Sequence, residues 1–454
     1  MIEPQMTPWT QEQLHDLAQR VIKLSSAEAV EVGLVGHTTF LTRFANSQIH
    51  QNVAEQDLRV TVRVAFGHKV GTSGTNDLSA EGLAATVRDA EALAKLQPEN
   101  PEFPGFAPPQ AYQPVDAAVA RTLAFSPADR ARVVQHVCHD AIRENLNASG
   151  AFSTGLTQLA IANSLGLWAY HAYTLADFNA VVMSDDSSGF SAASHIDAGQ
   201  IDGEALAEEA IDKALRSRKP QELEPGTYTV ILEEYAVNEM LGYLASGFSG
   251  EEVRQGRSFL SGRHGEKVAH KDISLWDDGH DMSGVPMPFD GEGTPKQRVM
   301  LMERGRLGEA VYDRHTAQLE GRASTGHYRA PGPFWGAGVA PQNLFMSPGV
   351  HTKDEMLEST ERGIWVTRFH YVNRLDPRRA VLTGMTRDGT FWIEDGKIVR
   401  PLKNMRFTQG VLDALGDVAM IGMETKLEGS PFGGGVHAPA LKINNFRFSG
   451  KTTF

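Results

Sequence analysis

Regular alternation of apolar and polar side chains is the feature that most constrains the fold of this chain. It is clearest at 58–66, where the apolar positions are Leu58, Val60, Val62 and Val64 and the polar positions are Arg59, Thr61 and Arg63. Successive side chains of a β-strand point to opposite faces, so this spacing predicts a strand with one buried face. Weaker alternation predicts further strands at 29–36, 39–44 and 47–52. Short connections between such strands predict an antiparallel sheet that is covered on one side.

Helical patterns surround these strands in the first half of the chain. Apolar residues recur at helical spacing in four segments, 11–24, 79–95, 126–142 and 203–218. Ser79 and Ser126 stand at the starts of the second and third segments, where a serine hydroxyl can cap a helix. Residues 97–114 contain six prolines, which predicts an extended connector. Helices packed on a sheet predict the α+β class, with an N-terminal α/β sandwich-like domain that contains the antiparallel sheet.

The second half of the chain differs from the first in its pattern of apolar residues. After one central helical pattern it consists mainly of short apolar segments between glycine turns, at 299–302, 364–367, 391–394, 398–400 and 442–448. Short strands at this spacing predict a β-rich C-terminal domain of the barrel-like or sandwich-like kind. A chain of 454 residues is also too long for one ordinary core. We therefore expect two domains, 1–220 and 221–454.

Charge and composition exclude several classes of function. The net charge is −13, from 56 acidic and 43 basic residues, and this balance repels nucleic-acid phosphates. No apolar run is long enough for a membrane-spanning helix, and the first ten residues lack a signal-peptide pattern. We therefore expect a cytoplasmic protein that binds neither nucleic acid nor membrane. Cys138 is the single cysteine, which excludes a disulfide within the chain and a thiol-rich metal site. Its apolar neighbours predict a buried, inert thiol.

The stretch that carries the chemistry is a strand at 227–232 followed directly by the central helix. The helix contains Asn238-Glu239-Met240-Leu241-Gly242-Tyr243, which has the spacing of a zinc-peptidase helix without its histidines. In such a helix two imidazoles bind one metal, and the glutamate beside the first ligand acts as general base. Asn238 and Tyr243 occupy the ligand positions here, and an amide and a phenol are poor zinc ligands. Only Glu239 keeps its expected chemistry; the alternative is an amphipathic helix whose glutamate faces solvent.

The wider sequence resembles the TldD/PmbA family, whose catalytic members carry a His-Glu-x-x-x-His helix. The resemblance spans nearly the whole chain and includes Arg43-Phe44-Ala45-Asn46, Ala162-Asn163-Ser164-Leu165-Gly166, Pro225-Gly226-Thr227-Tyr228-Thr229-Val230, Arg257-Ser258-Phe259-Leu260-Ser261-Gly262, Phe289-Asp290-Gly291-Glu292-Gly293-Thr294-Pro295 and Ala438-Pro439-Ala440-Leu441. Several blocks in the same order form a stronger signal than any single block. The resemblance implies the same division into an N-terminal and a β-rich C-terminal domain.

The resemblance also implies a third zinc ligand, a cysteine in a glycine-rich loop near the C-terminus. The corresponding loop, Ser430-Pro431-Phe432-Gly433-Gly434-Gly435, has no cysteine. Two helix ligands and one loop ligand are thus missing together, which leaves no first coordination shell. The resemblance therefore implies a PmbA/TldE-like subunit without its own zinc, which pairs with a zinc-bearing TldD-like catalytic subunit or with itself and acts in the proteolysis and maturation of peptides. Asn238, Glu239, Tyr243, Ser430 and the three glycines would line a pseudo-active site.

Two other functions stay open at this stage. The chain could be an active homodimeric metallopeptidase that uses Glu239 with a non-standard metal site, or a peptide-binding protein with no catalytic role. Candidate ligands for such a site are the scattered histidines of the second half, His264, His270, His280, His315, His327, His351, His370 and His437. Asp290 and Glu292, with Asp277 and Asp278, form an acidic cluster that could bind a hard cation. We expect instead a solvated turn around Gly291 and Gly293.

Overall fold

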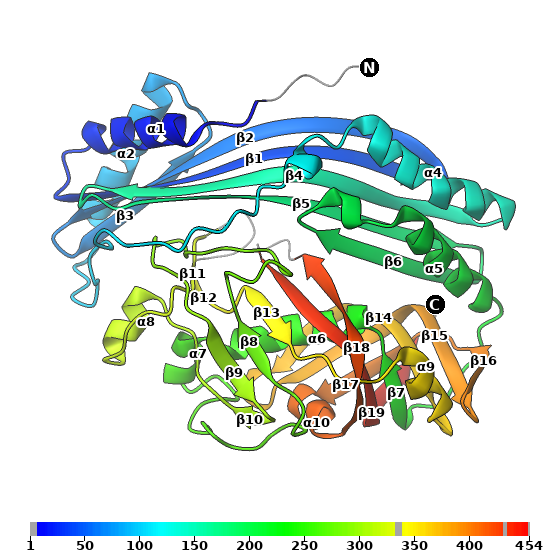
Figure 1. Ribbon diagram of the computed structural model, residues 1–454. Coiled ribbons are helices and arrows are strands. Elements are labelled where there is room, and N and C mark those ends of the chain that lie inside the picture. The colour runs from blue at the N-terminus through cyan, green and yellow to red at the C-terminus, as the bar shows by residue number, and fades with distance from the viewer. Residues whose placement is uncertain (1–6, 332–337, 430–433, 453–454) are drawn as a thin grey trace.

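The computed structural model describes residues 7–331, 338–429 and 434–452. Its N-terminal part is one antiparallel sheet of six strands in the order β3-β2-β1-β4-β5-β6, which arches over the rest of the molecule (Figure 1). The strands are β1 (Ala29–Ala45), β2 (Gln48–Phe66), β3 (Lys69–Thr75), β4 (Asn147–Asn163), β5 (Trp168–Met183) and β6 (Ser188–His195). The antiparallel sheet and the α+β class predicted from the sequence are confirmed.

The central strands of this sheet are longer than the sequence indicated. The expected strands at 29–36 and 39–44 are two halves of β1, and 47–52 is the first part of β2, so the prediction of separate strands was wrong. β1 and β2 pair along their full lengths, with one register shift where Arg43 faces Gln51 and Phe44 faces Ile49. His50 is therefore an extra residue in β2, which is a β-bulge. Polar side chains in the middle of both strands hid their continuity.

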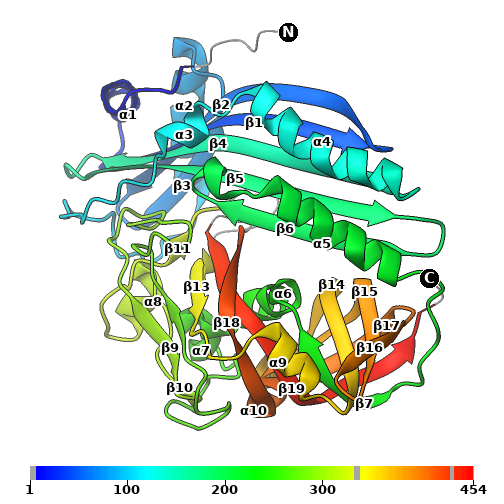
Figure 2. The same cartoon turned by 45° about the vertical axis from the view of Figure 1, so that its right-hand side comes forward.

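Helices cover only the outer face of the arch (Figures 1 and 2). They are α1 (Gln11–Leu24) and α2 (Ala80–Leu96) over one half, and α3 (Ala120–Leu123), α4 (Pro127–Arg143) and α5 (Gly203–Arg216) over the other. Ser79 caps α2 and Ser126 caps α4 through hydrogen bonds to backbone N–H groups, as predicted. Apolar side chains of β1 and β2 pack under α1 and α2 and form one core. Cys138 is buried in a second core under α4 and α5, which confirms the buried thiol.

The C-terminal part contains an eleven-stranded sheet that closes on itself. Its strands are β7 (Gly226–Leu232), β8 (Leu275–Asp277), β9 (Val299–Glu303), β10 (Arg306–Leu307), β13 (Asn343–Met346), β14 (Arg362–Asp376), β15 (Val381–Glu394), β16 (Lys397–Pro401), β17 (Met405–Gly410), β18 (Val418–Gly429) and β19 (Gly435–Lys451). β19 pairs with both β17 and β7, so β7, β14, β15, β17 and β19 form a five-stranded barrel. The β-rich, barrel-like prediction is confirmed.

Short elements complete the C-terminal part. They are α6 (Glu234–Ala245), α7 (Gly250–Arg254), α8 (Arg314–Leu319), α9 (Lys353–Glu358), α10 (Val411–Gly416), the two-stranded sheet of β11 (Tyr328–Arg329) and β12 (Gly338–Val339), and two 3-10 turns at Ser246–Phe248 and Pro377–Arg379. A further 3-10 turn, Ala198–Gln200, lies between β6 and α5 in the N-terminal part. α6 packs beside β14, β19 and β18. The β18–β19 hairpin rises from the barrel toward the underside of the arch (Figure 1). Among the described residues, no helix is both long and apolar enough to cross a membrane.

The proline-rich connector runs from α2 to α3 along one edge of the arch. It contains no regular helix or strand, as predicted. The Asn163 side chain donates to the carbonyl of Ala107, and Ala117 forms a parallel bridge with Tyr173 of β5. β6 pairs only with Ala176–Met183 of β5. The connector therefore covers the part of the β5 edge that β6 leaves free.

Candidate functional site at helix α6

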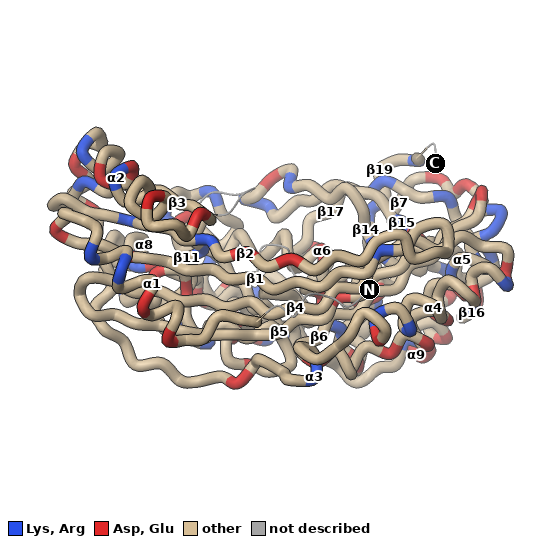
Figure 3. Tube along the Cα trace, turned by 90° about the horizontal axis from the view of Figure 1, so that it is seen from above, with Lys and Arg blue, Asp and Glu red and all other residues tan. Residues whose placement is uncertain are grey.

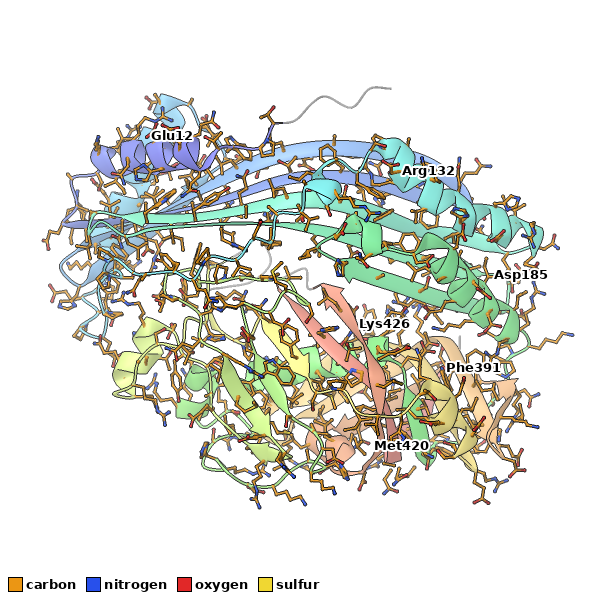
Figure 4. All side chains as sticks on the ribbon, in the orientation of Figure 1. Glu12, Arg132, Asp185, Phe391, Met420 and Lys426 are labelled. Atoms are coloured by element: carbon orange, nitrogen blue, oxygen red, sulfur yellow. The ribbon has the colours of Figure 1, made fainter. Side chains whose placement is uncertain are left out.

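Helix α6 starts in a buried network of charges that joins the two parts of the molecule. The Glu233 carboxylate, one residue before the helix, accepts from Lys213 Nζ of α5 at 2.6 Å. Lys213 also binds Glu209 at 2.7 Å, and Lys426 Nζ of β18 lies 3.1 Å from the same carboxylate. Although burial alone would raise it, the two lysines lower the pKa of Glu209 to about 2. Lys426 points from β18 toward the arch (Figure 4) and also donates to the Tyr235 hydroxyl at 2.9 Å.

The side chains at the two positions that would hold zinc ligands form hydrogen bonds to different strands. Asn238 Nδ2 donates to the carbonyl of Lys426 in β18 at 3.1 Å, and the side chain is 2% exposed. The Tyr243 hydroxyl donates to the carbonyl of Val372 in β14 at 2.6 Å. α6 is a regular helix, in which residues five apart are rotated by roughly 140° from each other. Asn238 and Tyr243 therefore do not converge on one point, and each is bound to backbone.

Glu239 is the half-buried carboxyl of the helix and has no hydrogen-bond partner among the described residues. Burial raises its pKa to about 7, and the Arg368 guanidinium partly opposes this rise. Arg368 is itself held by Asp388, to which its Nε donates at 2.7 Å, and it stacks over the Phe190 ring. Glu239 is therefore only partly exposed, and it lies within electrostatic range of Arg368 on β14 and Glu428 on β18.

Two further carboxyls share this region. Burial, followed by repulsion from Glu239 and Asp177, raises the pKa of Glu428 on β18 to about 7. The Glu428 side chain is exposed to solvent. Asp177 of β5 accepts from Ser194 at 2.6 Å, and Ser194 accepts from the backbone N–H of Gly429 at 3.2 Å. The last residue of β18 is thereby fixed to the arch.

The sequence did not reveal Asp177, Arg368 or Glu428. These residues come from β5, β14 and β18, and no local motif marks them, because only tertiary packing brings the three strands together near α6. Their signal would have been the odd placement of charged residues in otherwise alternating strands. The resulting surface has more acid than base, and it can hold protons near neutral pH.

The glycine-rich loop is described only at its end. Ser430 and Gly433 lie outside the described residues. Gly434 has φ +73°, and a Cβ there would lie 1.8 Å from the carbonyl oxygen of Gln342. Gly435 donates its N–H to the same oxygen at 2.8 Å. Gly434 and Gly435 therefore let the chain pass close to the backbone of Gln342, just before β13.

The acidic cluster at Asp290 and Glu292 is a buried turn, which corrects the expectation of a solvated one. Asp290 is 2% exposed and accepts from the backbone N–H groups of Glu292, Thr294 and Tyr328 at 2.8–2.9 Å. Burial raises the pKa of Asp290 to about 6, and burial with repulsion from Asp290 raises the pKa of Glu292 to about 8. The turn is buried because both the connector and the arch cover it.

This turn forms a second junction between the two parts. The Tyr112 hydroxyl of the connector donates to the carbonyl of Gly293 at 2.6 Å. Arg314 donates its backbone N–H to Glu292 and its guanidinium to the carbonyl of Gly105 at 2.6 Å. The Arg63 guanidinium on β2 contributes to the electrostatic environment of Glu292. The turn around Asp290 therefore has a structural role, because it connects the N-terminal and C-terminal parts of the molecule.

The described residues contain no group of three or more His, Cys, Asp or Glu side chains arranged to hold a metal ion. Among the candidate histidines, His327 is fully buried and its Nε2 lies 2.9 Å from Asp277. Lys296 Nζ lies 3.9 Å from the same carboxylate. Asp277 also accepts two backbone N–H groups, from Gln342 and Asn343. These partners fully occupy Asp277 in the packing of β8 against β13.

Comparisons with known proteins agree with this architecture. Three family models match the chain: PmbA/TldA metallopeptidase domain 1 over 30–94, the central domain over 116–218 and the C-terminal domain over 225–450. The chain is 27% identical over 289 residues to a metalloprotease TldD homolog of Buchnera aphidicola, covering 60% of this chain and 56% of that protein. It is 20% identical over 449 residues to the metalloprotease PmbA of Escherichia coli O157:H7, covering 95% and 96%.

A solved structure has the same fold. The crystal structure of TldE from Thermococcus kodakarensis superposes with a TM-score of 0.87 at 19% identity, covering 96% of this chain and all of that one. At this identity the likeness concerns the fold alone. For the Buchnera relative, the chain spans little more than half of that protein's length.

Proposed function

The chain belongs to the PmbA/TldD metallopeptidase family, and on that premise we propose that it is a subunit that binds no zinc of its own. It pairs with a family-related catalytic subunit that carries the zinc, and the pair acts on peptides. The observation that carries the proposal is the divergence of Asn238 and Tyr243. Each is bound to a backbone carbonyl on a different side of α6, so the residues present do not fit a zinc ion.

The surroundings of Glu239 support a role in contacting a peptide rather than in hydrolysing it. Burial raises the pKa of both Glu239 and Glu428 to about 7, and either carboxyl can accept hydrogen bonds from backbone N–H groups of an extended peptide. Gly242, three residues further along α6, is exposed, and a Cβ there would meet only a methyl group of Val436 at 3.8 Å. Such an open position on a helix permits close approach of another backbone.

The test is elemental analysis of the purified chain, alone and after mixing with a TldD-like partner. The proposal predicts no stoichiometric zinc in the lone chain and about one zinc ion per pair in the complex. E239Q in this chain should leave much of the peptidase activity of the complex intact. The same substitution of the motif glutamate in the partner should abolish it, because that residue serves as general base.

The other outcomes distinguish the alternatives. Stoichiometric zinc and peptidase activity in the lone chain would establish an active homodimeric enzyme with a non-standard metal site. Peptide binding without cleavage in any mixture would establish a peptide-binding protein.

A further inference from the structure

A pocket lies on the side of the C-terminal part that is turned away from the arch. It has a volume of about 430 Å³ and is formed by the loop at 270–274, the turn between β9 and β10, the segment 347–351 and the start of β18. Met420 marks its place at the lower end of β18, whereas Lys426 on the same strand lies close to the arch (Figure 4). The pocket shares no lining residue with the candidate site at α6, and its size suits a small ligand.

Hydrogen bonds hold the walls of this pocket in place. Ser347 donates its N–H to the carbonyl of Ser274 at 3.0 Å, and Ser274 donates its own N–H to the Ser347 hydroxyl at 3.2 Å. Gly349 donates its N–H to the carbonyl of Gly422 in β18 at 2.7 Å. These bonds join the segment 347–351 to the loop on one side and to β18 on the other. A ligand therefore does not have to order the walls when it binds, which lowers the entropic cost of binding.

Basic side chains dominate the lining of the pocket. Four basic residues and one acidic residue line it, namely His270, Lys271, Arg304, His351 and Asp272. Lys271 and Arg304 form no side-chain hydrogen bond or ion pair within the described part of the chain. The chain as a whole has a net charge of −13, and on the arch Lys and Arg lie among Asp and Glu, as on α2 and α4 (Figure 3). A pocket that gathers unpaired positive charge on an acidic protein attracts an anion.

Arg304 occupies a turn position that does not suit an arginine. Pairing of Glu303 with Arg306 leaves Arg304 and Gly305 as a two-residue loop between β9 and β10. Both have positive φ, +48° and +76°, as in a type I′ turn, where Asn-Gly is the preferred pair. The backbone N–H of Arg304 donates to the Ser274 hydroxyl at 3.0 Å, which fixes the turn to the loop of the pocket. The hairpin thus holds a conformationally strained arginine at the pocket, and strain of this kind is typical of functional sites.

From these observations we propose that the pocket binds a small organic anion, whose phosphate or carboxylate group is held by Arg304 and Lys271. A guanidinium can donate two parallel N–H bonds to either group, and an ammonium adds a compact positive charge. Val350, which is 79% exposed, and Pro348 also line the pocket, so the ligand carries an apolar part as well. The inference concerns a second site on the C-terminal part and does not depend on the function proposed above.

The first test is isothermal titration calorimetry of the full-length protein with phenyl phosphate, benzoate and benzyl alcohol. The proposal predicts saturable binding of at least one of the two anions and none of the neutral alcohol. Binding of phenyl phosphate alone would assign a phosphate ligand, binding of benzoate alone a carboxylate ligand, and binding of both a general oxyanion site. Saturable binding of neither anion, or equal binding of the alcohol, would overturn the proposal.

The second test assigns the binding to this pocket. R304N and K271Q should each weaken anion binding about tenfold, because a hydrogen bond to a charged group is lost. R304N also creates the preferred Asn-Gly turn, so its melting temperature should not fall and a folding defect could not explain the weaker binding. R306Q is the matched control, since it removes the same charge from the same hairpin at a residue that donates to the carbonyl of Gly265 and does not line the pocket. Unchanged affinity in R304N, or equal weakening in R304N and R306Q, would overturn the proposal.

Discussion

The carboxylates at the start of α6 and in its middle differ in how they are paired. At its start, Glu233 and its neighbours each have charged or hydrogen-bonding partners that come from three different elements. Further along the helix, Glu239 has no hydrogen bond or ion pair within the described part of the chain, and its pKa is raised where that of Glu209 is lowered. Both regions are enclosed by protein. The difference lies in pairing, and it separates a carboxylate that stabilises the fold from one that is available to a ligand.

The largest expected effect comes from removing a partner at the paired end. K213M leaves the carboxylates of Glu233 and Glu209 buried with fewer partners, and breaking a buried pair in this way costs about 3–5 kcal/mol. Equilibrium denaturation should show this loss. R88M, which removes an exposed ion pair with Glu81, is the control and should cost less than about 1 kcal/mol. Similar losses in the two variants would remove the distinction between the halves of α6.

A smaller effect of opposite sign is expected at the unpaired end. The folded pKa of Glu239 lies above the unfolded one, so its contribution to stability is complete below about pH 4.5 and is lost as pH rises through about 7. E239Q removes the ionisable carboxyl and with it this loss of stability at high pH. It should raise the free energy of unfolding at pH 8 by about 1–2 kcal/mol relative to wild type, a value reduced for the partial solvent contact of the carboxyl.

Denaturation at pH 5 and pH 8 checks this prediction. The gain from E239Q should be largest at pH 8 and should shrink toward pH 5. A variant that is less stable than wild type at pH 8 would show that Glu239 has a stabilising partner after all, and the comparison between the two halves would fail.

The smallest effect concerns the hydroxyl that occupies a ligand position. Y243F removes the hydrogen bond to the carbonyl of Val372 and should destabilise the protein by about 1 kcal/mol. Thermal melts should show this loss, and Y371F, at a residue that is 75% exposed, is the matched control that should leave the melting temperature unchanged. A neutral Y243F would mean that Tyr243 is free to serve another purpose, such as contact with a ligand.

Much of this architecture could be predicted from the sequence, because periodicity and capping are local. Alternation identified segments of the strands, although it divided β1 and β2, and Ser79 and Ser126 identified two helix starts. The acidic turn at Asp290 could not be understood in this way, since glycines and carboxylates in sequence look the same whether water or a connector covers them. The convergence of Asp177, Arg368 and Glu428 on α6 also depends on tertiary packing alone. The boundary at residue 220 stays a prediction.

The two junctions between arch and barrel have a mechanical consequence. One holds Lys213 and Lys426 at the start of α6, and the other holds Tyr112 and Arg314 around Gly293. A body attached at one point can swing about it, whereas a body attached at two separated points cannot hinge freely. The arch and the barrel are therefore coupled as a rigid frame, and heat should melt them in one cooperative transition rather than in two.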